Sequence, residues 1–475
     1  MAFDPELDLL YVGVGNGSPW NKHIRSPAGG DNLFLSSIVA VRPDTGEYVW
    51  HYQTTPGEAW DYTATQHMIL ADLNIDNKLR KVIMQAPKNG FYYVIDRVTG
   101  EFISADNYVP VSWASHIDPK TGRPVETDSS YKDEGRLQFP SPLGGHNWQP
   151  MCFSKDTGYV YIPSRELSFY YSQPDKFEYK PGTWNVGIPV MKDTDFPVGL
   201  DPNLLKTLGP STARGYLQAW DPIKQERVWE VKHTGPWNGG VLCTGGGLVF
   251  QGNASGYLVA YSASTGQKVW SYNAKHGIIA PPITYTVDGE QYITVMAGFG
   301  GSVGLSFSIT IKDIPVNHRT GRVLTFKLGA EAKQTIIEDV KRIAEPPPLT
   351  ASDDVLTLGN RHYHENCVYC HGPGAISSPA LRDLRYMNKA THDQFMAIVM
   401  EGSMEKIGMP GYSDMINEEQ ATAIHAYLTA LGHKTLEADS ANSAWVATKG
   451  AAYSVMAFFI GKFDKISVWF SNEGS

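Results

Sequence analysis

The chain has 475 residues, which is enough for two or more domains. Its formal net charge of −9 argues against a nucleic-acid-binding protein, because that function needs clustered basic residues. The 12 Trp, 25 Tyr and 46 Gly favour a β-rich fold with many turns over a helical one.

An internal repeat dominates residues 1–330. The segment Ala40–Trp50 recurs as Ala219–Trp229 and Ala260–Trp270, and Ala precedes Trp by ten positions in each copy. Val94–Ser104 is a weaker fourth copy. Each copy predicts a strand, a tight turn and a return strand, with Trp packed between neighbouring units. Such repeats predict the blades of a β-propeller, and they disfavour the alternative of a hairpin-rich sandwich.

Other segments of the first 350 residues fit this fold. Asp288-Gly289 predicts a hairpin turn. Residues 106–138 and 168–210 are predicted to be loops, and residues 331–350, with Pro346-Pro347-Pro348, a stiff linker. Short apolar runs bounded by Gly, Pro or Asp predict further strands, at Leu9–Val14, Lys81–Gln85, Phe91–Ile95, Tyr159–Ile162, Leu248–Gln251 and Tyr292–Ala297.

The segment Cys367-Val368-Tyr369-Cys370-His371 has the spacing that attaches a c-type haem through two thioethers. A thioredoxin-like motif would need a βαβ pattern, which we do not find here. A zinc site needs a second pair of ligands, and Cys152 and Cys243 are distant in sequence. His362 and His364 are close enough to the motif that zinc binding stays an alternative. Because Cys367 and Cys370 would be bonded to haem, we expect no disulfide framework.

A small helical domain is predicted around this motif, over residues 351–435. The expected helices are Asp353–Cys367, Phe395–Met400 and one from Asn417 through Leu431, ended by Gly432. We expect His371 and Met409 to ligate the haem iron, because Met409 lies in an extended Gly-Met-Pro-Gly loop. Met387, Met400 and Met404 are the alternatives.

The last segment, residues 436–475, has no assignment. Its apolar stretch Ala451–Gly461 is too short to cross a bilayer, so we expect no membrane span.

Four segments together resemble the quinohaemoprotein alcohol dehydrogenases that depend on pyrroloquinoline quinone (PQQ), over roughly residues 1–435. They are Gly13–Asn21, Trp60-Asp61-Tyr62, Ala86–Gly90 and Gly144–Pro150. The resemblance implies part of an eight-bladed all-β PQQ propeller, followed by an all-α cytochrome c domain. It also implies alcohol oxidation to aldehydes or ketones, with electrons passing to haem c and then to a soluble cytochrome, copper protein or quinone.

The resemblance also implies roles for single residues. Asp61 falls at the position of the catalytic base, and Asn16 and Asp61 at those of calcium ligands. Lys88, Asn147, Trp148, Trp237 and Asn238 fall at PQQ-contacting positions.

The start of the chain departs from this family. Its members carry a signal peptide, and Met1-Ala2-Phe3-Asp4 lacks the basic and apolar regions of one. Since covalent haem attachment implies export in bacteria, we expect a periplasmic protein in an N-terminally truncated form. The alternative function is an electron-transfer cytochrome on a catalytically incomplete propeller.

Overall fold

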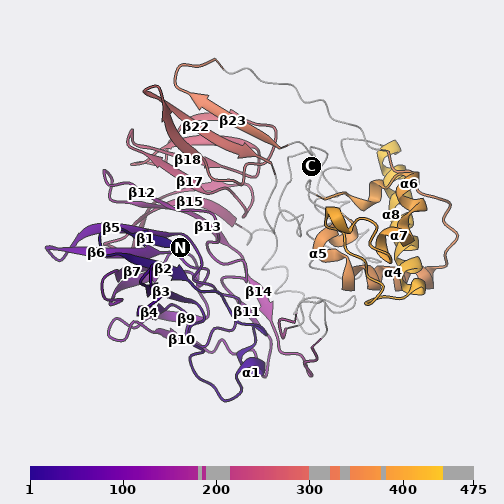
Figure 1. Cartoon of the computed structure of the whole chain (residues 1–475), viewed down its shortest axis with the longest axis horizontal. Coiled ribbons are helices and arrows are strands. Elements are labelled where there is room, and N and C mark those ends of the chain that lie inside the picture. The colour runs from indigo at the N-terminus through magenta and orange to yellow at the C-terminus, as the bar shows by residue number, and fades with distance from the viewer. Residues whose placement is uncertain (180–184, 189–213, 299–320, 332–342, 376–380, 442–475) are drawn as a thin grey trace, which may run out of the picture.

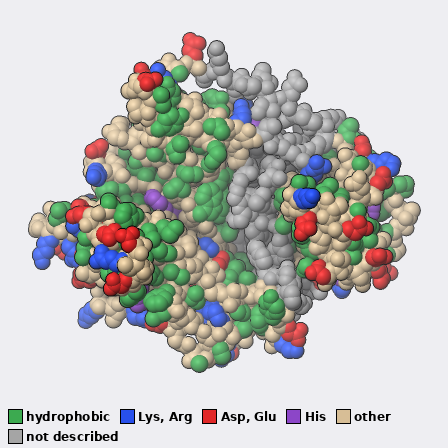
Figure 2. All heavy atoms as spheres, in the orientation of Figure 1, with side chains coloured by type: hydrophobic (Ala, Val, Ile, Leu, Met, Phe, Trp, Pro, Cys, Tyr) green, Lys and Arg blue, Asp and Glu red, His purple; other side chains and the backbone are tan. Residues whose placement is uncertain are grey.

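The computed structural model describes residues 1–179, 185–188, 214–298, 321–331, 343–375 and 381–441. Strands occupy the first part of the chain, and helices follow from residue 353 onward (Figure 1). On the face seen in Figure 2, acidic and basic side chains are interspersed over the helical part rather than separated by sign. The predicted order, an all-β part followed by an all-α part, is confirmed.

Antiparallel sheets follow one another along the chain. The first contains β1 (Ala2–Asp4), β2 (Leu9–Gly13), β3 (Ser37–Val41) and β4 (Tyr48–Gln53). The second contains β5 (Met68–Ile75), β6 (Lys78–Gln85), β7 (Phe91–Asp96) and β8 (Phe102–Asn107). The third contains β12 (Cys152–Phe153), β13 (Val160–Glu166), β15 (Arg214–Asp221) and β16 (Glu226–His233). The fourth contains β17 (Val241–Thr244), β18 (Leu248–Gly252), β19 (Tyr257–Ser262) and β20 (Lys268–Asn273), and the fifth β21 (Ile283–Val287), β22 (Glu290–Ala297) and β23 (Arg322–Lys327).

The sequence repeat corresponds to one hairpin of each of the first four sheets. Ala40 lies opposite Trp50, and the same register pairs Ala219 with Trp229 and Ala260 with Trp270. A bulge follows the first residue of each pair. The weaker copy obeys the same rule, since Val94 pairs with Ser104. The spacing of ten residues is therefore a cross-strand register, as the prediction of strand, turn and return strand requires.

The repeat tryptophans lie between neighbouring sheets. A Cβ on Gly100 would lie 2.8 Å from the ring of Trp50, and a Cβ on Gly266 would lie 2.7 Å from that of Trp229. Both glycines have a positive φ, 78° and 72°, in the turn of the next sheet along the chain. The Trp of one sheet therefore packs on the glycine turn of the next, as predicted.

A disulfide joins the third and fourth sheets. Cys152 in β12 and Cys243 in β17 are bonded, with their Cα atoms 5.8 Å apart and 91 residues between them in sequence. The expectation of no disulfide framework was wrong, since Cys152 and Cys243 are bonded. Distance along the chain does not prevent pairing once two adjacent blades bring strand ends together.

The segment 106–138 is more regular than predicted. Besides the end of β8 it contains β9 (Ala114–Ile117), β10 (Pro124–Glu126) and β11 (Arg136–Gln138). β9 pairs with β10, and β11 pairs with β14 (Phe169–Tyr171), which lies in the second predicted loop. Much of the remainder of that second loop lies outside the described residues. A short helix, α1 (Lys22–Arg25), is capped by Asn21, whose side-chain oxygen accepts from the backbone of His23.

The helical part is built on two crossing helices, α4 (Asp353–Asn366) and α8 (Glu418–Ala441). A Cβ on Gly359 would lie 2.0 Å from the carbonyl oxygen of Ala423, so glycine permits this close approach. The shorter helices are α5 (Val368–His371), α6 (Lys389–Asp393) and α7 (Phe395–Val399). The first two predicted helices are thus confirmed.

The end predicted for the last helix was wrong. The helix continues past Gly432 to Ala441. Gly432 is buried, and a Cβ there would lie 3.2 Å from Pro346 of the linker. This glycine makes room for a neighbouring segment and does not end the helix. The predicted apolar stretch Ala451–Gly461 lies outside the described residues.

Candidate active site

Asp61 and Lys88 form an ion pair with little exposure to water. Lys88 Nζ donates to Asp61 Oδ2 over 2.9 Å and to its backbone oxygen over 3.1 Å. The two side chains are only 18% and 11% exposed. Burial raises the pKa of the Asp61 carboxyl above its ordinary value, and the Lys88 charge acts in the opposite direction. A carboxylate in this setting is suited to take up a proton.

The turn that carries Asn16 is joined through Ser36 to the segment that carries Asp61. Ser36 donates from its backbone N–H to Gly15 O over 2.9 Å, and its hydroxyl donates to Tyr62 O. The Asn16 Nδ2 donates to Gly17 O over 3.2 Å.

The segment Gly144–Trp148 packs against Lys88. Gly144 has φ +75°, and a Cβ there would lie 2.5 Å from Cγ of Lys88. The Gly145 N–H donates to Lys88 O over 3.1 Å. Asn147 donates to Leu143 O over 2.9 Å, and Trp148 is 40% exposed. These contacts place the predicted cofactor segment next to the predicted cofactor lysine.

Trp237, with Asn238 after it in the chain, lies next to the residue that precedes this segment, Leu143. Trp237 is buried and packs against Leu143. Asn238 is also buried, and its amide bonds locally, with Nδ2 donating to Gly235 O over 2.8 Å and Oδ1 accepting from Ala254 over 3.2 Å. Asn238 therefore shapes the backbone around Trp237, whereas the Trp237 indole N–H has no acceptor among the residues described.

Sequence reasoning missed Glu58, a fully buried carboxyl two residues before Trp60. Its Oε1 accepts from the backbone N–H groups of Trp60 and Tyr62, over 2.5 and 2.8 Å, on both sides of Asp61. Burial raises the pKa of Glu58 to about 8. The only sequence signal was an acidic residue close to an aromatic motif, which is common on protein surfaces.

The side chains around Asp61 include hydrogen-bond donors that suit a quinone and oxygen atoms that suit a cation. Lys88 and the unpartnered Trp237 N–H supply donors for the oxygens of PQQ, and Asn16 and Asp61 supply the oxygen ligands that calcium prefers. Across the described ranges, no group of three or more His, Cys, Asp or Glu is placed to hold a metal. Asn16 and Asp61 alone would therefore make up only part of a calcium site.

The haem motif lies at the end of α4 and in α5. Cys367 and Cys370 are free thiols, and His371 closes α5. Burial lowers the pKa of the His371 imidazole, which favours the neutral form that ligates iron. Two free thiols and a neutral imidazole within one helical turn fit a covalent haem.

Met409 packs against the core of the helical part. It packs in a cluster that includes Cys367, and its N–H donates to Met404 O over 3.2 Å. Tyr412, three residues later, lies near enough to both cysteines to interact with their charges. The cluster also contains Met387, Met400 and Met404, so Met409 stays a prediction.

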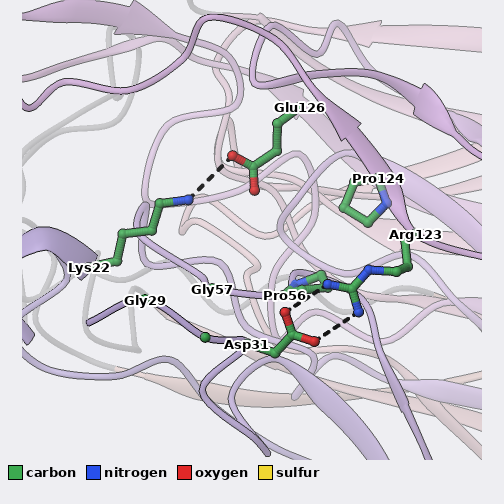
Figure 3. Close-up of a pocket in the computed structure, with 9 residues that line it drawn as sticks. Lys22, Gly29, Asp31, Pro56, Gly57, Arg123, Pro124 and Glu126 are labelled. Carbon is green, nitrogen blue, oxygen red and sulfur yellow. Dashed lines mark hydrogen bonds and ion pairs between the residues drawn. The ribbon is translucent and has the colours of Figure 1, made fainter. Parts of the chain in front are cut away.

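A separate surface pocket of about 250 Å³ lies near the loop that leads to Trp60 (Figure 3). Lys22 pairs with Glu126 across it over 3.3 Å, and Arg123 pairs with Asp31 over 2.7 Å. These four side chains satisfy one another. The pocket contains none of the predicted site residues.

Membrane insertion through a helix finds no support in the described part of the chain, where no helix combines the length and apolar character that crossing requires.

Comparison with known proteins supports the order of a propeller followed by a cytochrome domain. The model of the glucose/ethanol/alcohol dehydrogenase β-propeller domain, named PQQ, matches residues 1–121 and 122–293. The cytochrome c oxidase, cbb3-type, subunit III model matches residues 354–428. The chain is 47% identical over 442 residues to quinohemoprotein alcohol dehydrogenase ADH-IIG of Pseudomonas putida, covering 91% of this chain and 60% of that protein.

Solved structures give the same result. The structure of quinohemoprotein alcohol dehydrogenase ADHIIG from Pseudomonas putida HK5 superposes with a TM-score of 0.82 at 43% identity, covering 95% of this chain and 65% of the other. The quinohemoprotein alcohol dehydrogenase of Comamonas testosteroni gives 0.75 at 39% identity, covering 91% and 62%. The chain spans about three fifths of the length of its curated relatives. It belongs to the glucose/ethanol/alcohol dehydrogenase β-propeller family, and its propeller is followed by a cytochrome c domain.

Proposed function

We propose that this chain oxidises an alcohol to an aldehyde or ketone with PQQ and calcium, and passes the electrons to a covalently bound c-type haem. The observation that carries the proposal is the buried Asp61–Lys88 pair, which is connected to the segments that carry Asn16 and Asn147. A binding module without catalysis has no need for a base and a cation held together out of water.

The chain's own residues would share the work as follows. The Asp61 carboxylate accepts the hydroxyl proton of the alcohol, which its raised pKa favours. Lys88 donates from Nζ toward quinone oxygens, Asn147, Trp148, Trp237 and Asn238 line the cofactor site, and Asn16 joins Asp61 in holding calcium. When bound, PQQ supplies a two-electron acceptor, calcium a Lewis acid and haem a one-electron relay.

Cys367 and Cys370 would form the covalent bonds to the haem, and His371 and Met409 would ligate its iron. The terminal acceptor would be a soluble cytochrome, a copper protein or a quinone. We place the protein in the periplasm, because both covalent haem attachment and the Cys152–Cys243 disulfide suit an oxidising compartment.

The first test is the substitution Asp61→Asn, which keeps the size and polarity of the side chain but cannot take up the proton. We expect the alcohol-dependent rate to fall by roughly 10²–10⁴-fold while PQQ still binds. Asp44→Asn, in the exposed turn of the first sheet, is the matched control. Equal rates for the wild-type chain and Asp61→Asn would contradict the assignment. A chain that carries haem but never transfers electrons from an alcohol would support the alternative, an electron-transfer cytochrome on an incomplete propeller.

A further inference from the structure

Arg165 is a fully buried cation next to the candidate cofactor segment. It lies in β13 and is 1% exposed. Its backbone N–H donates to Gly145 O over 2.8 Å, and the Gly145 N–H in turn donates to Lys88 O. Only one residue therefore separates the backbone of Arg165 from that of Lys88.

The charge of Arg165 has no counter-ion among the described residues. It forms no ion pair with any Asp or Glu that the structure describes. Burial lowers the pKa of its guanidinium to about 9, so the group still carries its charge at neutral pH. A buried cation without a counter-ion is costly, which suggests that an anion belongs beside it.

Unused hydrogen-bond donors gather at the same place. Arg165 Nη2 donates to Gln149 Oε1 over 2.8 Å, and its guanidinium carbon lies 3.8 Å from the ring centroid of Trp237. Arg165 Nε and Nη1, Gln149 Nε2 and Trp237 Nε1 are all buried without an acceptor in the described part of the chain. All four atoms are donors, so the missing partner must be rich in acceptors.

We propose that Arg165, Gln149 and Trp237 form a binding site for a carboxylate group, and that a carboxylate of the quinone cofactor occupies it. Occupancy by the quinone cofactor rests on the proposed function, whereas the carboxylate site itself does not. A carboxylate accepts several hydrogen bonds and matches the fork of a guanidinium. PQQ is a polycarboxylate, and the site adjoins Lys88 through Gly145.

The experiment compares Arg165→Met, which keeps the bulk over Trp237 but removes the charge and the donors, with the wild-type chain. Arg214→Met is the matched control, because Arg214 is a half-exposed arginine on the paired strand β15 and lies over Tyr216. The measured quantities are the Kd of the full-length apo chain for PQQ and for PQQ trimethyl ester, by quenching of tryptophan fluorescence. We expect Arg165→Met to weaken PQQ binding by roughly 10–100-fold and to leave ester binding unchanged. Arg214→Met should change neither.

A second measurement tests whether the site binds a free carboxylate anion in the absence of PQQ. The Tm of the apo chain is measured in sodium formate and in sodium chloride of equal ionic strength. A larger rise in formate for the wild-type chain than for Arg165→Met supports the carboxylate site even if PQQ does not bind, in which case only the proposed function fails. Equal PQQ affinities together with equal responses to formate would overturn the site and leave water as the partner of these donors. An equal loss of PQQ and ester binding would also overturn it, because Arg165 would then act only through packing.

Discussion

At the residue scale, Asp61 is held in a backbone conformation that side chains rarely adopt. Its φ is +66°, in the left-handed region, which costs a non-glycine residue roughly 1–3 kcal/mol. Glu58 offsets this cost, because one carboxyl oxygen accepts from the N–H groups on both sides of Asp61. A buried carboxyl thus fixes the turn that aims the candidate base.

Glu58 should make the stability of the propeller depend on pH. Its pKa is about 8 in the folded chain against 4.5 as the ordinary value, so the folded state binds the proton more tightly. The contribution of protonated Glu58 to the unfolding free energy is therefore complete below pH 4.5 and is lost as the pH rises toward 8. Glu58→Gln keeps the accepting oxygen and removes the titration. From pH 5 to pH 8, we expect the unfolding free energy of the wild-type chain to fall by roughly 2–4 kcal/mol relative to the variant.

Urea unfolding followed by tryptophan fluorescence measures this difference, since no Trp lies between residues 351 and 435. All other groups titrate in both proteins and cancel in the comparison. Glu47→Gln, at an exposed position in the first sheet's turn, is the control and should follow the wild-type curve. Parallel pH curves for the wild-type chain and Glu58→Gln would show that Glu58 does not bind its proton more tightly in the fold.

At the scale of elements, the blades are joined by tryptophans that pack on glycine turns. Gly46 and Gly266 occupy equivalent turns with the same φ, +72°. A Cβ on Gly46 would meet nothing within 4 Å, whereas one on Gly266 would lie 2.7 Å from Trp229. The two positions therefore separate backbone strain from packing.

We expect Gly46→Ala to lower the unfolding free energy by roughly 1 kcal/mol through backbone strain alone. Gly266→Ala should cost about 1–3 kcal/mol more, because it also displaces Trp229. Urea unfolding of both variants gives the two values. Equal costs would mean that Trp229 contributes little to the contact between the third and fourth sheets.

The Cys152–Cys243 bond should stabilise the same junction covalently. It closes a loop of 91 residues, so the double variant Cys152→Ser/Cys243→Ser should lose about 2–5 kcal/mol of unfolding free energy. Reductant should destabilise the wild-type chain and leave the double variant unchanged. A variant as stable as the oxidised wild-type chain would show that the blades hold this register without the bond.

The sequence predicted the elements well where a local pattern sets them. The Ala-to-Trp spacing gave the hairpins, because a cross-strand register fixes the number of residues between two partners. Features set by distant contacts were missed. The disulfide depends on two blades meeting, and Gly432 looked like a helix end because its neighbour Pro346 is far away in sequence.

The same distinction applies to the candidate site. Asp61 and Lys88 could be named from motifs, and the structure brings them within 2.9 Å of each other. Glu58 and Arg165 could not, because a buried ionisable group is identified by its surroundings and both residue types usually face water.

At the scale of the whole molecule, one chain combines a propeller of the PQQ family with a cytochrome c domain. A quinone accepts electrons in pairs and a haem carries them singly, so the two domains would perform successive steps of one reaction. The proposed function requires that electrons from an alcohol reach the haem through the propeller site.

The most direct test uses the full-length chain produced in a bacterial periplasm. A pyridine haemochrome spectrum first establishes the c-type haem, and the haem spectrum is then followed on addition of ethanol or a longer primary alcohol, with and without PQQ and calcium. We predict haem reduction by an alcohol only when both are present. A bound haem that no alcohol reduces under any of these conditions would contradict the proposed function and leave the chain as an electron-transfer cytochrome.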